Sequence, residues 1–175
     1  MDNLNNLLQN ITHIRTSALN DWGSIHPLIV HFPIGLLLIV PLFIVLGLIF
    51  SKQARAFYLT SLILLWIGTI FLFLAVSSGK LAGERVQPNP AILETLETHE
   101  HFAEESRTLF CILAIVLTGY VSLCLPFPKL QAKWNAISLI GFLFVYTYAL
   151  LILTAAAHHG GQLVHLHGIT SKMYK

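Results

Sequence analysis

Four long runs of residues contain no Asp, Glu, Lys or Arg, and this feature limits the possible folds more than any other. A helix needs about 20 apolar residues to cross the hydrocarbon core of a bilayer, and most of these runs have that length. The third run is shorter, and we expect it to continue a helix that begins outside the membrane. The charge-free runs are residues 27–50, 57–79, 109–125 and 134–157. The membrane spans predicted from them are residues 27–50, 57–79, 107–125 and 134–158.

The composition excludes an ordinary soluble domain. Of the 175 residues, 55% are hydrophobic and only 10% are charged, whereas an average soluble domain is about 25% charged. A soluble fold of this size could not bury so much apolar surface. The sequence therefore predicts an all-α membrane protein, a four-transmembrane-helix bundle that occupies residues 23–169 and is followed by a tail over 170–175.

Residues 1–22 are expected to form an amphipathic helix at the N-terminus. They lack the basic start and compact apolar run of a cleavable signal peptide. The helix could lie on the membrane surface or pack on the bundle, and the pattern fits both readings. The apolar residues that recur at helical spacing are Leu4, Leu7, Leu8, Ile11, Ile14, Ala18 and Trp22.

The charges in the connections predict the orientation in the membrane. Residues 51–56 and 126–133 each carry two basic residues and no acid, whereas residues 80–106 carry Lys80 and Arg85 against six glutamates. Basic residues in short loops mark the cytoplasmic side. We therefore expect a protein of the bacterial inner membrane with both termini on the periplasmic side. The net charge of +2, without a basic stripe, argues against nucleic acid as a partner.

All nine histidines lie in segments that this orientation places on the periplasmic side. Imidazole is the commonest metal ligand in proteins and titrates near neutrality. The functional site is therefore expected at the outer end of the bundle. These histidines are His13, His26, His31, His99, His101, His158, His159, His165 and His167.

The first span begins with a histidine-proline motif. Pro27 suits the first position of a helix, and Ser24 is placed to cap it. Pro33 has no N–H group, so the carbonyl of Ile29 loses its usual partner and the helix is expected to bend. His26 then lies at the membrane edge.

His31 is expected about one turn deeper than His26, on the same helix face as Gly35. A polar ring at membrane depth is costly and is commonly functional. The missing side chain at Gly35 leaves a gap beside the imidazole, which a flat macrocycle or a neighbouring helix could fill. His31 is therefore a candidate ligand or proton carrier. The alternative is that it is a structural histidine held by hydrogen bonds.

The third span is preceded by a helix that should start at Asn89-Pro90, a sequence typical of a helix N-terminus. His99 shares the apolar face of this helix and is expected to point into the bundle. His101 lies on the opposite face among carboxylates, because positions i and i+2 are far apart around a helix. Glu100 could orient a neighbouring imidazole by accepting a hydrogen bond.

The fourth span ends with His158 and His159, followed by a glycine pair. We expect Gly160 and Gly161 to end the helix and let the chain turn. His165 and His167 would face the same way in an extended segment. A short His-rich tract suggests metal binding, but the alternative is a tail without a ligand role.

These residues resemble the bacterial membrane-protein family labelled domain of unknown function 2231. The resemblance covers residues 24–169 and rests on the His-Pro-x-x-Val-His-Phe-Pro-Ile run at 26–34, the pair His99-Glu100, and the Gly-Gly-x-Leu-Val-x-x-His-Gly run at 160–168. The histidine before the glycine pair, His158, is similar to one found in a related subset of proteins. In that subset the same four-helix unit is joined to a c-type cytochrome domain. The resemblance implies a respiratory or redox setting, although this chain has no Cys-x-x-Cys-His motif.

Three hypotheses about function remain open. The first is an electron-transfer protein that binds b-type haem through two histidines from facing helices. The second is a non-haem site for copper, zinc or iron. The third is an accessory subunit of a respiratory membrane complex. The candidate haem ligands are His26, His31, His99 and His158, and the candidate metal ligands are His31, His99, His158, His165, His167 and Glu100.

No sequence pattern of a hydrolase or a kinase is present, so catalytic turnover is left undecided. The lipid bilayer is the first expected partner. A c-type cytochrome or a subunit of a respiratory complex is the second, and it follows from the resemblance and not from spacing.

Overall fold

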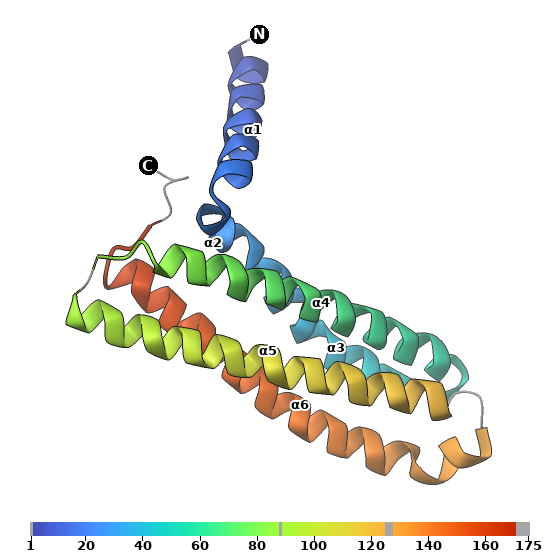
Figure 1. Ribbon diagram of the computed structural model, residues 1–175. Helices are drawn as coiled ribbons and strands as arrows, with labels where there is room; N and C mark the ends of the chain where they lie inside the picture. Colours follow the sequence, from blue (N-terminus) through green and yellow to red (C-terminus); the bar gives the residue numbers. More distant parts are fainter. Residues whose placement is uncertain (1, 88, 125–127, 171–175) are drawn as a thin grey trace.

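The computed structural model of the protein describes residues 2–87, 89–124 and 128–170, with side chains for all of these except 2, 13–20, 124 and 128–135. No strand occurs within these ranges. Figure 1 shows an N-terminal helix attached to a bundle of long helices. The α-helices are α1 (Asp2–Asn20), α2 (His26–Ile29), α3 (His31–Ile49), α4 (Ala54–Gly83), α5 (Pro90–Cys124) and α6 (Pro128–His165), and short 3₁₀ helices cover Trp22–Ile25 and Ser51–Gln53.

Four segments are long and apolar enough to cross a membrane, so the predicted fold class is confirmed. They are Trp22–Ile49, Ser51–Gly83, Pro90–Leu123 and Ala136–His165. Residues 171–175 of the predicted tail and the side chains of His13, Ile14 and Ala18 lie outside the described residues.

The spans form an up-and-down bundle in which helices that are consecutive in the chain are neighbours in space. Helix α3 packs on α4, α4 on α5, and α5 on α6, while α3 and α6 close the bundle with a less extensive contact. We call the end where α2, the start of α5 and the end of α6 meet the histidine end. It is the end that the sequence predicts to be periplasmic.

The inward faces of the spans are apolar residues at helical spacing. They interdigitate along the bundle axis and leave the outward faces of the same helices exposed, as expected for lipid-facing surfaces. The most deeply buried include Leu37, Val40 and Ile44 on α3, Tyr58 and Leu65 on α4, Phe110 and Leu117 on α5, and Leu139 and Tyr146 on α6.

A proline inside α3 explains a buried hydrogen bond between α3 and α6. Pro41 has no N–H group, so the carbonyl oxygen of Leu37 cannot bond within its own helix. The hydroxyl of the buried Tyr146 donates to that oxygen over 2.8 Å. A backbone carbonyl in a membrane has no water to replace a lost partner. Tyr146 therefore satisfies an acceptor that Pro41 frees.

This pairing gives a stability prediction. Tyr146→Phe should lower the free energy of unfolding by about 1–3 kcal/mol, because it leaves a buried carbonyl without a donor. The same change in a Pro41→Ala background should cost less, since residue 41 then supplies its own N–H. Equilibrium unfolding in mixed detergent micelles measures all four proteins of this double-mutant cycle. Equal losses in both backgrounds would contradict the assignment.

The start of the first span differs in detail from the sequence prediction. The helix is interrupted at Val30, between α2 and α3, which agrees with the expected bend before Pro33. Ser24 is not the cap of α2, because it lies within the 3₁₀ turn Trp22–Ile25. The side chain of Asp21 caps that turn instead, by accepting from the Ser24 N–H over 3.1 Å.

Asp21 also forms an ion pair with Arg85, beyond the end of α4. The hydrogen bond and the negative charge of Asp21 raise the pKa of Arg85 above its usual value. This pair, together with the cap, fixes the joint between α1 and the bundle.

The start of α5 is as predicted, and the end of α6 is not. Helix α5 begins at Pro90, and the Asn89 side chain accepts from the N–H of Ala91 over 3.1 Å. Helix α6 runs through Gly160 and Gly161 to His165, so the glycine pair does not end it. The glycine that permits the turn is Gly168, with φ of 65°. The segment from His165 to His167 is a helix end and a turn, and not an extended strand.

Candidate functional site

A pocket of about 430 Å³ lies at the histidine end, with walls from α2, α3, α4, α5 and α6. Its exposed lining residues include His31 and Ile34 of α3 and Ala157 and Val164 of α6, so it opens on the side of the bundle between these two helices. Its inner wall is apolar and includes Val30, Leu72, Val76 and Leu153. Its polar lining residues are His26, His31, Lys80, His99, Glu100, Glu104 and His165.

His26 is held against α4 by its Nδ1 atom. This atom lies 2.9 Å from the carbonyl oxygen of Ala75 and 3.1 Å from the Ser78 hydroxyl. The Ser78 hydroxyl itself donates to the Ala75 carbonyl. A carbonyl oxygen only accepts, so Nδ1 carries the proton and donates it. The Nε2 atom of neutral His26 therefore has a free lone pair.

His99 is held against α6 in the same way. Its Nδ1 atom lies 2.7 Å from the carbonyl oxygen of Ala156 and must donate the proton. Its Nε2 atom is again left as an acceptor. Histidines that bind metals usually donate their other ring N–H to a carbonyl or carboxylate, which fixes the tautomer and the ring orientation. The two backbone carbonyls place both rings in this state.

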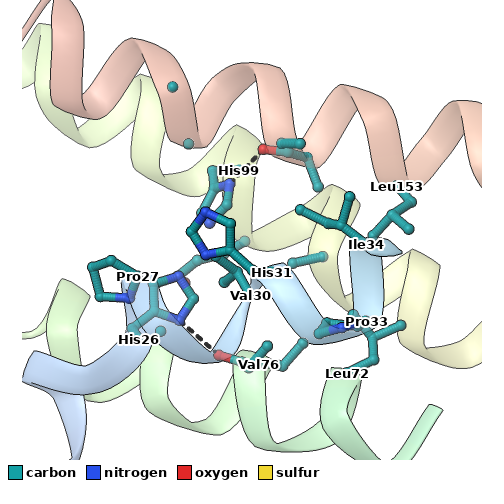
Figure 2. A pocket seen from close by; sticks show the side chains of 18 of the residues that line it. His26, Pro27, Val30, His31, Pro33, Ile34, Leu72, Val76, His99 and Leu153 are labelled. Carbon is teal, nitrogen blue, oxygen red and sulfur yellow. Dashed lines mark hydrogen bonds between the residues drawn. The ribbon is translucent and has the colours of Figure 1, made fainter. Parts of the chain in front are cut away.

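The two rings face each other across the pocket. Their centroids are 6.3 Å apart and their planes are 78° apart. In Figure 2, the hydrogen bond of His26 points toward α4 and that of His99 toward α6, so their hydrogen-bonded edges point away from each other. His31 lies between them in this view.

Two glycines make room for these imidazoles. A Cβ atom at Gly79 would lie 2.9 Å from Cε1 of His26, and one at Gly160 would lie 3.0 Å from Cε1 of His99. A Cβ at Gly161 would meet nothing within 4 Å. Gly160 is therefore needed for close packing of His99 on α6, and not for a turn.

A second pocket, of about 400 Å³, adjoins the first on the side of Trp22–Ile25 and the residues after α6. The residues that line both pockets are His26, Pro27, Gly79, His99, Gly160 and Val164. The two imidazoles therefore lie at the boundary between a cavity that opens beside the spans and a cavity at the end of the bundle.

Comparison with known proteins identifies the family. Residues 23–173 match the family described as a predicted membrane protein, DUF2231. The chain belongs to this family. Neither the curated proteins nor the solved structures gave a match. The resemblance inferred from the histidine motifs is thus confirmed, while the family description adds no ligand or activity.

In this DUF2231 protein, His158 is not part of the pocket. It is exposed, and its Nε2 atom lies 3.2 Å from the side-chain nitrogen of Gln162. Gln162 also accepts from Nδ1 of His159 over 3.0 Å. The His159 ring stacks on Phe102 of α5, with centroids 5.7 Å apart. Together with the exposed His101, these residues form a separate group on the outside of α5 and α6.

The remaining predicted site residues have different surroundings. His31 and His165 line the pocket with exposed side chains. His167 lies outside it and donates from Nε2 to the Thr95 hydroxyl over 3.2 Å, which ties the end of the chain to α5. Glu100 lines the pocket, but backbone carbonyls orient the imidazoles, so the expected role of Glu100 falls to Ala75 and Ala156.

Sequence reasoning missed the contribution of α4. Lys80 forms an ion pair of 2.5 Å with Glu104 at the edge of the pocket, and Ala75, Ser78 and Gly79 surround His26. The run of small residues Ser77-Ser78-Gly79, near the end of a helix that otherwise has large side chains, could have indicated that α4 contributes to the site. Within the described ranges, no three side chains of His, Cys, Asp or Glu gather closely enough to hold a metal ion.

Proposed function

We propose that this DUF2231 protein is a membrane electron-transfer protein that binds b-type haem between His26 and His99 at its periplasmic end. The ligand pair differs from the combinations of His31, His99 and His158 that the sequence favoured. His26 replaces His158 because its ring, and not that of His158, lies opposite His99.

The observation that carries the proposal is the separation of the two rings. Two imidazoles on opposite sides of one metal ion, each at a metal–nitrogen distance of about 2.0–2.1 Å, have ring centres roughly 6 Å apart. The rings of His26 and His99 are 6.3 Å apart, and each has its Nδ1 proton committed to a backbone carbonyl. The chain thus offers two pre-oriented Nε2 lone pairs.

The number of donors favours haem over a bare metal ion. A protein site for zinc or copper commonly needs three or four ligands from the chain. Haem needs only one or two axial histidines, because the macrocycle supplies the other nitrogens. His31 and Glu100 also line this pocket, but no three such side chains in the described part of the chain gather closely enough to hold a metal ion, so the pair His26 and His99 suits the second case.

The pocket walls fit an amphiphilic cofactor. Leu72, Val76 and Leu153 provide an apolar lining, and the volume of about 430 Å³ falls within the range of about 300–1,000 Å³ usual for cofactor pockets. When bound, haem supplies a one-electron redox centre. His26 and His99 would hold the haem, and ligation by both imidazoles would favour electron transfer over oxygen binding.

The adjoining pocket at the end of the bundle suggests where an electron partner approaches. This pocket is lined by the same two imidazoles. With the histidine end in the periplasm, as proposed, a water-soluble carrier would approach the site from there without entering the membrane. A c-type cytochrome or a subunit of a respiratory complex is the proposed partner.

An absorption spectrum tests the proposal. The full chain, purified from membranes of haem-replete cells, should show a Soret band and sharpen its α and β bands on reduction, at one haem per chain. A colourless protein with stoichiometric copper, zinc or iron would instead support a non-haem metal site. A protein with neither would reject both and leave the accessory-subunit hypothesis.

A further inference from the structure

Helix α1 carries an apolar face that no other described part of the chain covers. Leu4, Leu7, Leu8 and Ile11 follow the i, i+3, i+4, i+7 spacing of one helix face, and their exposed fractions lie between 53% and 61%. Lipid-facing residues of the spans have similar values, such as 64% for Leu38 and 63% for Leu151. These residues of α1 are therefore as unprotected as side chains that face acyl chains.

The direction of α1 fits a position at the membrane surface. It leaves the bundle at the histidine end and runs across the direction of the four spans, not along it (Figure 1). Spans cross the bilayer, so a helix that runs across them at their end lies close to the membrane plane. Trp22, 37% exposed at the joint, is of the type that favours the water–lipid interface.

The joint that sets this direction is closely packed. The backbone at Gly23 lies so close to α4 that an added Cβ would be 2.9 Å from the Ala82 nitrogen. Asp21 caps the adjoining turn and pairs with Arg85. These contacts hold the turn Trp22–Ile25 against α4 and so set the direction in which α1 extends from the bundle.

We propose that α1 lies in the water–lipid interface with Leu4, Leu7, Leu8 and Ile11 inserted among the lipids. The described side chains favour lipid over a protein partner, because four residues on one helix offer far less area than the about 1,200–2,000 Å² of a stable protein interface. Asp2 and Arg15 are the only Asp, Glu, Lys or Arg residues between 2 and 20. Insertion should therefore depend on the apolar face and not on anionic lipids.

Site-directed spin labelling of the full chain in vesicles tests this proposal. Ile11→Cys places a label on the apolar face, and Gln9→Cys places the matched control two residues away, about 200° around the helix. Both are made with Cys111→Ala and Cys124→Ala. If that background does not fold, the native cysteines stay and their signal is subtracted. Collision with oxygen reports lipid exposure, and collision with a water-soluble nickel chelate reports water exposure.

The label at position 11 should collide with oxygen and be protected from nickel, and the label at position 9 should show the reverse. The result should be the same in vesicles of phosphatidylcholine alone and in vesicles that also contain phosphatidylglycerol. Equal nickel access at both positions would overturn the proposal, as would protection of position 11 from both reagents, which indicates a protein cover. Insertion only with phosphatidylglycerol would overturn it too. None of these outcomes depends on haem.

Discussion

Replacing His99 with alanine is expected to leave the purified protein without haem, and His26→Ala should have the same effect. Each imidazole is a proposed haem ligand whose Nδ1 atom bonds to a backbone carbonyl, and the two ring centres are 6.3 Å apart across the pocket. Loss of either would leave a single imidazole to hold the haem in a pocket that opens on the side of the bundle, so the cofactor would be lost during purification. Haem per chain, measured by the pyridine haemochrome assay after detergent purification, should fall from about one to near zero.

Two histidines serve as matched controls. His101 lies two residues from His99 on the same helix but is exposed, and His158 lies two residues from Ala156 but outside the pocket. His101→Ala and His158→Ala should both keep the wild-type haem content. If His158→Ala loses haem while His26→Ala retains it, the proposed ligand pair is wrong.

The second large effect is expected at the glycine pair of α6. Gly160→Ala puts a Cβ atom 3.0 Å from Cε1 of His99, so the ring must move by a few tenths of an ångström, which disturbs its hydrogen bond to the Ala156 carbonyl. Changes to groups that orient a ligand typically weaken metal binding by about 10–100-fold, and haem affinity should drop by a similar factor. Titration of the haem-free protein with haem measures this change.

Gly161→Ala is the control for that substitution, because an added Cβ there meets nothing within 4 Å. It should keep the wild-type affinity. If both variants behave alike, the glycines act through helix flexibility and not through the fit of His99.

The sequence was sufficient to predict the membrane bundle, because long runs without charge have few other solutions. It also placed His26, His31 and His99 correctly at one end of the bundle. The start of α5 at Asn89-Pro90 followed from local chemistry, since a side-chain cap and a proline act within one turn.

The position of His158 could not be predicted, because it depends on where α6 ends. A turn at Gly160 would have freed the preceding residues to face the pocket. The helix instead continues, and Ala156 and Gly160 share the face that packs on His99. His158 is two residues from each of them and so lies on the other side of α6. A glycine needed for close packing looks the same in a sequence as a glycine that ends a helix.

The partners of the two imidazoles were hidden for a different reason. They are the backbone carbonyls of Ala75 and Ala156, which every residue has, so no side-chain pattern marks them. The sequence instead offered Glu100, a side chain of the appropriate chemistry next to His99. Only the packing of α4 and α6 against the rings distinguishes the two possibilities.

The central claim is that His26 and His99 bind one iron from opposite sides, and electron paramagnetic resonance of the oxidised protein tests it most directly. Two imidazole ligands predict a low-spin signal. The near-perpendicular ring planes, 78° apart, predict that this signal is strongly anisotropic. A high-spin signal, or a low-spin signal that is unchanged in His26→Ala, would contradict the account.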